Sequence, residues 1–206
     1  GVGRFDKIAL DKMLAGKVVS VKPWINGLQE GLRGSASPED LETLLQLVYL
    51  YGTEPRADTT AFAAYQAWMR GMLENRSASP EAAFGDTLQV VLAQHHFRSR
   101  PWSEALIGEM DLMTSYRIYQ QRFGDFGDFI FIFVGNFALA EIEPLVCRYL
   151  GSLPSAGREE SWRDVGIEPP QGLVERYVYK GLEAKSRTRM VFTGDFEWNY
   201  TNFFTI

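Results

Sequence analysis

The sequence predicts a fold in which β-strands and amphipathic helices pack in one α/β layer. The main observation is residues 129–134, six consecutive apolar residues that are all β-branched or aromatic. A run this short and this apolar is typical of a strand buried on both faces. Gly135 and Asn136 favour a turn after it, and residues 139–150 then place their apolar side chains on one stripe of a helix. A second observation is a hairpin signal near the N-terminus. A third is a series of helix starts between that hairpin and residues 129–134.

The composition indicates a globular protein with a sizeable core. The chain has 206 residues, 46% hydrophobic and 23% charged, which is enough for one large domain or for one domain and part of another. The net charge of −5 comes without a basic tract and argues against nucleic acid as the main partner. No run of 18 apolar residues occurs, so no membrane span is predicted. The opening at Gly1, without an initiator Met or a signal peptide, is expected of a piece of a longer protein.

The first predicted structure is a β-hairpin over residues 16–34. Valines at positions 18, 19 and 21 precede Pro23, and they favour a strand. Asn26–Gly27 is a strong signal for a two-residue hairpin turn, because both residues accept a positive φ. Glycines weaken the pattern of the second strand, so the sequence does not define where it ends.

Four helices are predicted between this hairpin and the apolar run. Ser37–Pro38 and Ser79–Pro80 each place a serine cap before a proline at the first helical position. Asp58 caps a helix between these two, and a fourth helix extends from Asp111 to about residue 123. In the first three segments apolar residues recur at helical spacing, which predicts one buried face for each of these helices.

The C-terminal part has a different composition. Glycines and prolines interrupt residues 155–172, which indicates a linker or a long crossing loop. Residues 173–179 and 185–193 read as two strands without a helix to cover them, so they either join the first sheet or open a second domain. Residues 199–206 show no helical pattern. Apolar side chains at Phe196, Trp198, Phe203 and Phe204 are expected to be exposed and to favour dimerisation that is not native.

The two histidines, His95 and His96, are adjacent and do not form a metal site. Neighbouring side chains point about 100° apart on a helix and to opposite faces on a strand, so one ion cannot easily bind both. A zinc site would also need an acid three or four residues away, where Ser99 and Arg100 stand instead. We therefore interpret them as the end of a helix, where imidazoles meet the last carbonyls.

Other candidates for chemistry have structural explanations. Cys147 is the only cysteine, which excludes an internal disulfide, and no base or electropositive turn accompanies it as a nucleophile would require. No G-x-S-x-G segment occurs, and the glycines of residues 124–127 precede a strand rather than a helix, unlike a phosphate loop. Acidic pairs such as Glu159–Glu160 and Glu141 with Glu143 are typical of solvated faces. The residues alone predict no catalytic, cofactor-binding or metal-binding position.

Four stretches of the sequence resemble the insulinase/pitrilysin-type zinc metallopeptidases. These are residues 119–137 (YQQRFGDFGDFIFIFVGNF), residues 142–154 (IEPLVCRYLGSLP), the helix within residues 41–56, and residues 185–194 (KSRTRMVFTG). In that family a helix leads to an apolar strand ending in Val-Gly-Asn or Val-Gly-Asp, followed by a helix and a Leu-Gly-x-Leu-Pro exit. The likeness covers about residues 8–198, and residues 129–154 are its most specific part.

The resemblance implies an α+β fold with an antiparallel-rich mixed sheet covered by helices, as in the repeated domain of mitochondrial-processing-peptidase-like metallohydrolases. It implies that residues 1–154 form a non-catalytic repeat, that residues 155–172 are a linker, and that residues 173–206 are the first strands of a following, truncated domain. It also implies two halves that close around a peptide substrate. The partner is then the catalytic half, in the same polypeptide or in a sister subunit, and a periplasmic or cytoplasmic bacterial location would fit.

The catalytic motif of that family, H-x-x-E-H, does not occur in this sequence. The family's further zinc ligand is expected near the end of the helix that holds Gly71 and Met72, which do not ligate metals, and Glu74 is offset. No zinc is therefore expected in this chain, although the full enzyme would hold it. Whether the chain acts in an enzyme depends on whether a catalytic half accompanies it. The leading hypothesis is a non-catalytic wall of the substrate chamber, and the alternative is a scaffold or protein-binding subunit of the same fold.

Overall fold

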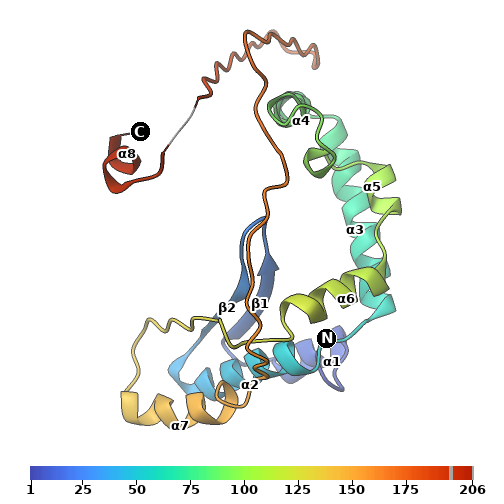
Figure 1. The fold of residues 1–206 in the computed structure, drawn as a ribbon. Helices are drawn as coiled ribbons and strands as arrows, with labels where there is room; N and C mark the ends of the chain where they lie inside the picture. The colour runs from blue at the N-terminus through green and yellow to red at the C-terminus, as the bar shows by residue number, and fades with distance from the viewer. Residues whose placement is uncertain (195–196, 206) are drawn as a thin grey trace. The chain divides into compact units, whose positions relative to one another are not determined.

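The computed structural model describes residues 1–194 and 197–205 of the chain. Its elements are α1 (Lys7–Met13), β1 (Val19–Ile25), β2 (Glu30–Ala36), the 3₁₀ turn η1 (Pro38–Asp40), α2 (Leu41–Thr53), α3 (Thr59–Ser77), α4 (Pro80–Leu92), the 3₁₀ turn η2 (Phe97–Ser99), α5 (Glu104–Gly108), α6 (Leu112–Arg122), α7 (Leu139–Tyr149) and α8 (Tyr200–Thr205) (Figure 1). The fold is dominated by helices. Among the described residues none of these helices is long and apolar enough to cross a membrane.

The chain divides into two compact units that are not consecutive in sequence. The first unit comprises residues 1–70 and 105–163, and the second comprises residues 71–104 and 164–206. The boundary falls within α3 and again at the start of α5.

The predicted hairpin is confirmed in the first unit. Strands β1 and β2 pair antiparallel, with Val19 opposite Ala36 at one end and Ile25 opposite Glu30 at the other. The turn lies one residue later than Asn26–Gly27, because the backbone N–H of Asn26 donates to the carbonyl of Gln29 at 2.8 Å and leaves Gly27 and Leu28 between them. The side-chain oxygen of Asn26 also accepts hydrogen bonds from two backbone N–H groups of the same turn, so Asn26 closes the turn.

Helix α2 packs against the hairpin on one side and against α7 on another (Figure 1). The core on the hairpin side is formed by Val2, Leu10, Val21 and Leu47. A second, aromatic cluster gathers Phe123, Phe126 and Leu153, which lie at the ends of α6 and α7, with Tyr49 of α2 packed against it. Helix α2 thus contributes side chains to both clusters, and Leu32 of β2 packs against both as well.

The second unit contains residues 71–77, the last part of α3, and all of α4. The serine cap predicted for α4 is confirmed, because the Ser79 hydroxyl accepts a hydrogen bond from the backbone N–H of Ala82 at 3.1 Å. The Arg76 guanidinium forms two hydrogen bonds to the Asp86 carboxylate, at 2.5 and 2.9 Å, and joins α3 to α4. A bidentate pair of this kind fixes the orientation of both side chains.

The prediction of a buried strand at residues 129–134 is wrong for this structure. The segment has no strand assignment, and the exposed fractions of Ile130, Ile132 and Val134 are 85%, 80% and 93%. The strands predicted at residues 173–179 and 185–193 are also absent, and most of residues 164–194 are exposed. High β-propensity does not make a strand unless another strand satisfies its backbone groups, and the sheet formed by the described residues has two strands, β1 and β2.

The C-terminal segment holds a short helix that the sequence pattern did not predict. In α8 the backbone N–H of Asn202 donates to the side-chain oxygen of Asn199 at 2.8 Å, so Asn199 caps the first turn. The predicted exposure of Trp198, Phe203 and Phe204 is confirmed, while Phe196 lies outside the described residues.

Candidate functional site

The adjacent histidines lie where the sequence placed them, directly after the end of α4. His95 has a positive φ of 60°, and its backbone N–H donates to the carbonyl of Val90 at 2.9 Å. The Nδ1 atom of His96 accepts the backbone N–H of Arg98 at 3.2 Å. The helix end is therefore confirmed, but backbone N–H groups rather than imidazoles meet the last carbonyls. With one imidazole nitrogen already used in the turn, this pair does not fit a zinc site.

The other sequence candidates are scattered over exposed positions. Cys147 is free and exposed on α7, and Glu141 and Glu143 are exposed on the same helix. Gly71, Met72 and Glu74 are exposed positions of α3. Across residues 1–194 and 197–205, no three His, Cys, Asp or Glu side chains come together in a way that could hold a metal ion.

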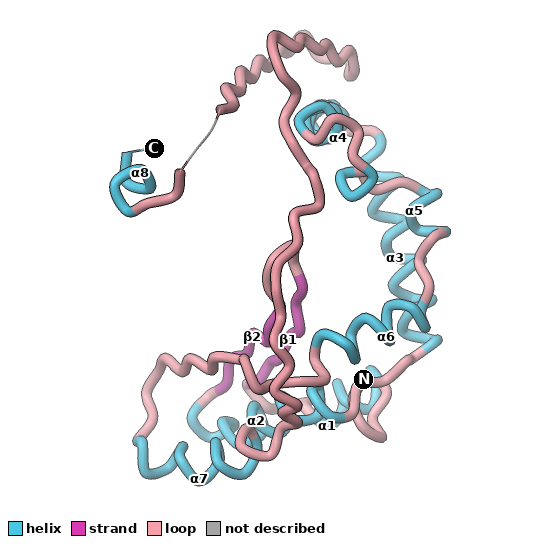
Figure 2. Tube along the Cα trace, in the orientation of Figure 1, coloured by secondary structure: helices cyan, strands magenta, loops and turns pink. Residues whose placement is uncertain are grey.

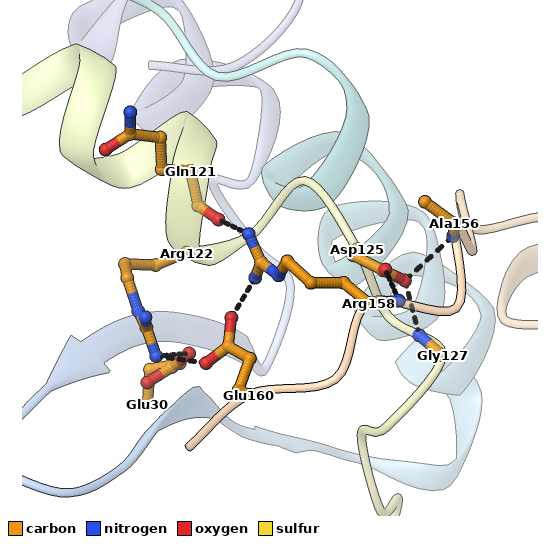
Figure 3. A network of polar contacts seen from close by, with 8 residues as sticks. All are labelled: Glu30, Gln121, Arg122, Asp125, Gly127, Ala156, Arg158 and Glu160. Atoms are coloured by element: carbon orange, nitrogen blue, oxygen red, sulfur yellow. Dashed lines mark hydrogen bonds and ion pairs between the residues drawn. The ribbon is translucent and has the colours of Figure 1, made fainter. Parts of the chain in front are cut away.

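The structure instead places a network of charged groups at the end of α6, against which residues 156–160, which follow α7, are held (Figure 3). Its centre is Asp125, a carboxylate that is buried to 5% exposure. The Oδ1 atom accepts the backbone N–H groups of Gly127 at 2.9 Å and Ala156 at 3.0 Å. The Oδ2 atom accepts the backbone N–H of Arg158 at 2.9 Å. One side chain therefore joins two segments about 30 residues apart in the chain.

These hydrogen bonds determine the charge state of the carboxylate. Donation from the backbone N–H of Arg158, and then from those of Gly127 and Ala156, lowers the pKa of Asp125 below its usual value. Each donor stabilises the ionised form, so the group is an anion at neutral pH. It is fully engaged and has no proton to give to a substrate.

Two arginines and two glutamates surround this centre. The Arg122 guanidinium contacts the Glu30 and Glu160 carboxylates, each at 2.5 Å, and the Glu30 carboxylate raises the pKa of Arg122. The Arg158 guanidinium pairs with Glu160 and donates to the carbonyl oxygen of Gln121 at 2.5 Å. Glu160 thus bridges both arginines (Figure 3). The network attaches the segment after α7 to α6 and to the first residue of β2.

A shallow cleft of about 470 Å³ lies beside the aromatic cluster, and no charged side chain lines it. Its walls include Gly52, Pro55, Tyr119, Phe123 and Pro154. The Tyr119 hydroxyl donates to the carbonyl oxygen of Tyr51 at 2.9 Å, and burial raises the pKa of Tyr119 well above its usual value. The phenol therefore stays neutral, and the Thr53 and Ser152 hydroxyls that also line the cleft donate to the backbone carbonyls of Tyr49 and Arg148.

Taken together, the polar groups of the first unit serve to hold segments in place. Among the described residues every buried side-chain nitrogen or oxygen has a hydrogen-bond partner. A catalytic site would require a group that is available to a substrate. What the arrangement does is fix the path of residues 156–160 on the first unit.

The sequence pattern does not reveal this network. Asp125, followed two positions later by Gly127, carries the signal of an Asx turn. That signal explains one hydrogen bond of three. The other two come from Ala156 and Arg158, and no local pattern connects those positions to Asp125.

Comparison with known proteins found matches in structure but not in sequence. No family model matches the chain, and no curated protein matches it. Its fold matches the periplasmic protease PqqL from Escherichia coli with a TM-score of 0.65 and 22% identity. It also matches the ferredoxin protease FusC, solved as a variant in complex with Arabidopsis ferredoxin, with a TM-score of 0.60 and 15% identity.

The chain shares the fold of part of these two proteases. Each match covers 82% of this chain, but it covers only 19% of the PqqL chain and 18% of the FusC chain. The chain therefore spans about a fifth of the length of the solved structures that it matches. A likeness at this level of identity concerns the fold, and it does not by itself carry over an activity.

Proposed function

We propose that this chain is part of the non-catalytic half of an insulinase-like zinc metallopeptidase, where it helps to form the wall of the peptide chamber. The observation that carries the proposal is the fold match to PqqL and FusC over most of the chain. The stretches at residues 119–137 and 142–154, which resemble the same peptidase family, support it independently. In this proposal residues 1–154 are one repeat of the family, residues 155–172 a linker, and residues 173–206 the start of the next domain.

The catalytic groups belong to the partner half in this proposal. The two histidines of this chain, His95 and His96, are adjacent, so the chain cannot supply an H-x-x-E-H motif. Zinc, which would polarise the peptide carbonyl and activate a water molecule when bound, is assigned to the catalytic half of the same polypeptide or of a sister subunit. This chain contributes shape to the chamber and a surface for pairing with that half.

The proposal is tested by peptide cleavage with and without the partner. The chain alone should neither bind zinc in a one-to-one ratio nor cleave a quenched fluorescent peptide. Mixed with the segment that carries H-x-x-E-H, encoded upstream in the same frame or in an adjacent gene, it should form a complex that cleaves the peptide. A complex in which the motif glutamate is replaced by glutamine is the control and should be inactive.

The outcomes separate this proposal from its alternatives. Tight one-to-one zinc with turnover by the chain alone would overturn it. A gene neighbourhood without an H-x-x-E-H sequence would favour the second role, a scaffold or protein-binding subunit of the same fold. A complex that forms but gains no activity from this chain would favour the same role.

A further inference from the structure

The turn that joins β1 to β2 contains a reactive pair of residues, Asn26 and Gly27 (Figure 2). The backbone nitrogen that follows an asparagine can attack the side-chain carbonyl of that asparagine, and glycine leaves this nitrogen least hindered because it has no Cβ. The chain has five asparagines, and the other four precede an arginine, a tyrosine or a phenylalanine. Asn26 is therefore the asparagine with the most accessible neighbouring nucleophile.

The backbone nitrogen of Gly27 is unpaired and open to solvent. Its N–H makes no hydrogen bond with another residue that the structure describes. Gly27 is exposed, and a Cβ built on it would meet no atom within 4 Å. The next residue, Leu28, is 78% exposed. Water can therefore reach both this nitrogen and the amide beside it.

The side chain of Asn26 is ordered over its own turn. Its Oδ1 atom accepts the backbone N–H of Leu28 at 2.8 Å and that of Gln29 at 2.7 Å. The amide thus folds back along the main chain and does not extend into solvent. The backbone N–H of Asn26 donates to the carbonyl of Gln29, which closes the turn around this arrangement. Such ordering removes part of the entropic cost of an attack within the molecule.

The same two N–H groups face the oxygen on which charge develops during that attack. When the Gly27 nitrogen adds to Cγ of Asn26, the carbonyl oxygen Oδ1 becomes an oxyanion. Donors that already point at such an oxygen stabilise the tetrahedral intermediate, as the oxyanion hole of an acyl-transfer enzyme does. The hydrogen bonds from residues 28 and 29 therefore activate the side-chain amide.

We propose that Asn26 is a site of spontaneous deamidation in the folded chain, with water as the co-reactant. The Gly27 nitrogen forms a bond to Cγ of Asn26 and loses its proton, while the bond from Cγ to Nδ2 breaks and ammonia leaves. The product of this step is a cyclic imide. Water then opens the imide at either of its two carbonyls and gives aspartate or isoaspartate at position 26. The inference is independent of the peptidase proposal.

Either product alters the end of the hairpin. Both add one negative charge to a chain whose formal net charge is −5. Isoaspartate also adds a carbon to the backbone of the turn, directly beside the pair formed by Ile25 and Glu30. The Glu30 carboxylate contacts the Arg122 guanidinium, so the modified turn lies next to the charged network at the end of α6.

The first test follows the intact chain at neutral pH in water enriched in heavy oxygen. After digestion in ordinary water, trypsin releases residues 18–33 as one peptide, since it does not cut between Lys22 and Pro23. Mass spectrometry should show conversion of Asn26 before that of Asn136, with one heavy oxygen in the product. A methyltransferase specific for isoaspartate should label part of this product. Ion exchange should resolve a more acidic species that Asn26→Gln does not form.

The matched control for the nucleophile is Gly27→Ala. The φ of Gly27 is not positive and its Cβ position is empty, so alanine fits the turn and hinders only the attacking nitrogen. Conversion should slow at least several-fold, with unchanged circular dichroism. Equal rates in Gly27→Ala and the unaltered chain, equal conversion of Asn136, or a product without heavy oxygen would overturn the proposal.

The effect of the two N–H donors is tested by removing the fold. A synthetic peptide of residues 18–33 contains the same Asn26–Gly27 pair without the ordered turn. The folded chain should convert at least as fast as this peptide under the same conditions, because its donors are already in place. A folded chain that converts more slowly than the peptide would show that the turn protects Asn26, and it would overturn the proposal.

Discussion

The Asp125 carboxylate is the side chain on which the geometry after α6 depends most. It is buried, it accepts three backbone hydrogen bonds, and two of these hold the segment that follows α7. Replacing it with another residue leaves backbone N–H groups without their acceptor, which costs more than the loss of an exposed hydrogen bond.

We expect Asp125→Asn to lower the free energy of unfolding at pH 7, since an amide has one accepting oxygen where the carboxylate has two. The pKa of Asp125 is lowered in the fold, so its stabilising contribution is present above the usual aspartate pKa of about 4 and is lost as pH falls through the lower folded value. In urea unfolding measured between pH 7 and pH 3, the free energy of unfolding should fall less with decreasing pH in Asp125→Asn than in the unaltered chain.

Asp128→Asn is the control for that experiment, because Asp128 is exposed three residues away. It should change neither the free energy of unfolding at pH 7 nor the decrease in that free energy at acid pH. Equal pH profiles for the unaltered chain and Asp125→Asn would contradict the role assigned to Asp125.

The Phe123 ring is the second side chain with a clear expected cost. It is 1% exposed and stacks on Tyr119 at 4.5 Å between centroids. Phe123→Ala should lower the free energy of unfolding by about 3–5 kcal/mol, because it removes buried apolar area and leaves a cavity. Phe97→Ala, at a ring that is 65% exposed, should change it by less than about 0.5 kcal/mol. Urea unfolding followed by circular dichroism measures both, and similar effects of the two variants would contradict the packing described for the aromatic cluster.

Among the secondary-structure elements, the longer helices were predictable, the short helices α1, α5 and α8 were not, and the strands were predictable only in part. Three helices begin at capping signals that can be recognised in the sequence, namely Ser79–Pro80, Asp58 and Asp111. Capping acts within one helical turn, so it does not depend on distant parts of the chain. The hairpin was found because its turn signal is local as well. The six residues from Phe129 to Val134 have a strong strand preference, but a strand depends on a partner elsewhere in the chain or outside it, and periodicity does not identify one.

The helical glycines provide a direct comparison of propensity with packing. A Cβ added at Gly85 of α4 would have nothing within 4 Å, whereas at Gly52 of α2 it would lie 2.6 Å from the Phe126 ring. Gly85→Ala should raise the free energy of unfolding by about 0.5–1 kcal/mol through helix propensity. Gly52→Ala should lower it by about 1–3 kcal/mol through overpacking. Thermal and urea unfolding of the two variants test this, and stabilisation by both would contradict the close approach of Phe126 to α2.

At the level of the entire chain, the sequence gives no indication that residues 155–163 belong to the first unit. The composition of residues 155–172 indicated a linker, but the contacts of residues 156, 158 and 160 attach its first part to the first unit. The sequence carried no signal for this, because the charged partners are more than 30 positions away.

Limited proteolysis distinguishes the attached part of this segment from the rest. Trypsin should cut first at Arg176, Arg187 or Arg189, which are exposed, and later at Arg158, whose backbone and guanidinium are both engaged. Mass spectrometry of the early products should therefore show an N-terminal fragment that retains residues 1–163. In Asp125→Asn the cut at Arg158 should come earlier. Early cleavage at Arg158 in the unaltered chain would contradict the anchoring.

The Asp125 anchor recognises backbone and not side chains. Its contacts to Ala156 and Arg158 are both made to main-chain N–H groups, so the carboxylate does not discriminate between the residue types at those positions, except that proline would remove the donor. Residue 156 can therefore change in type, proline excepted, and keep its contact to Asp125, whereas positions 158 and 160 are also held through their side chains. An anchor of this kind tolerates mutation at one position of a connecting segment while the path of that segment stays the same.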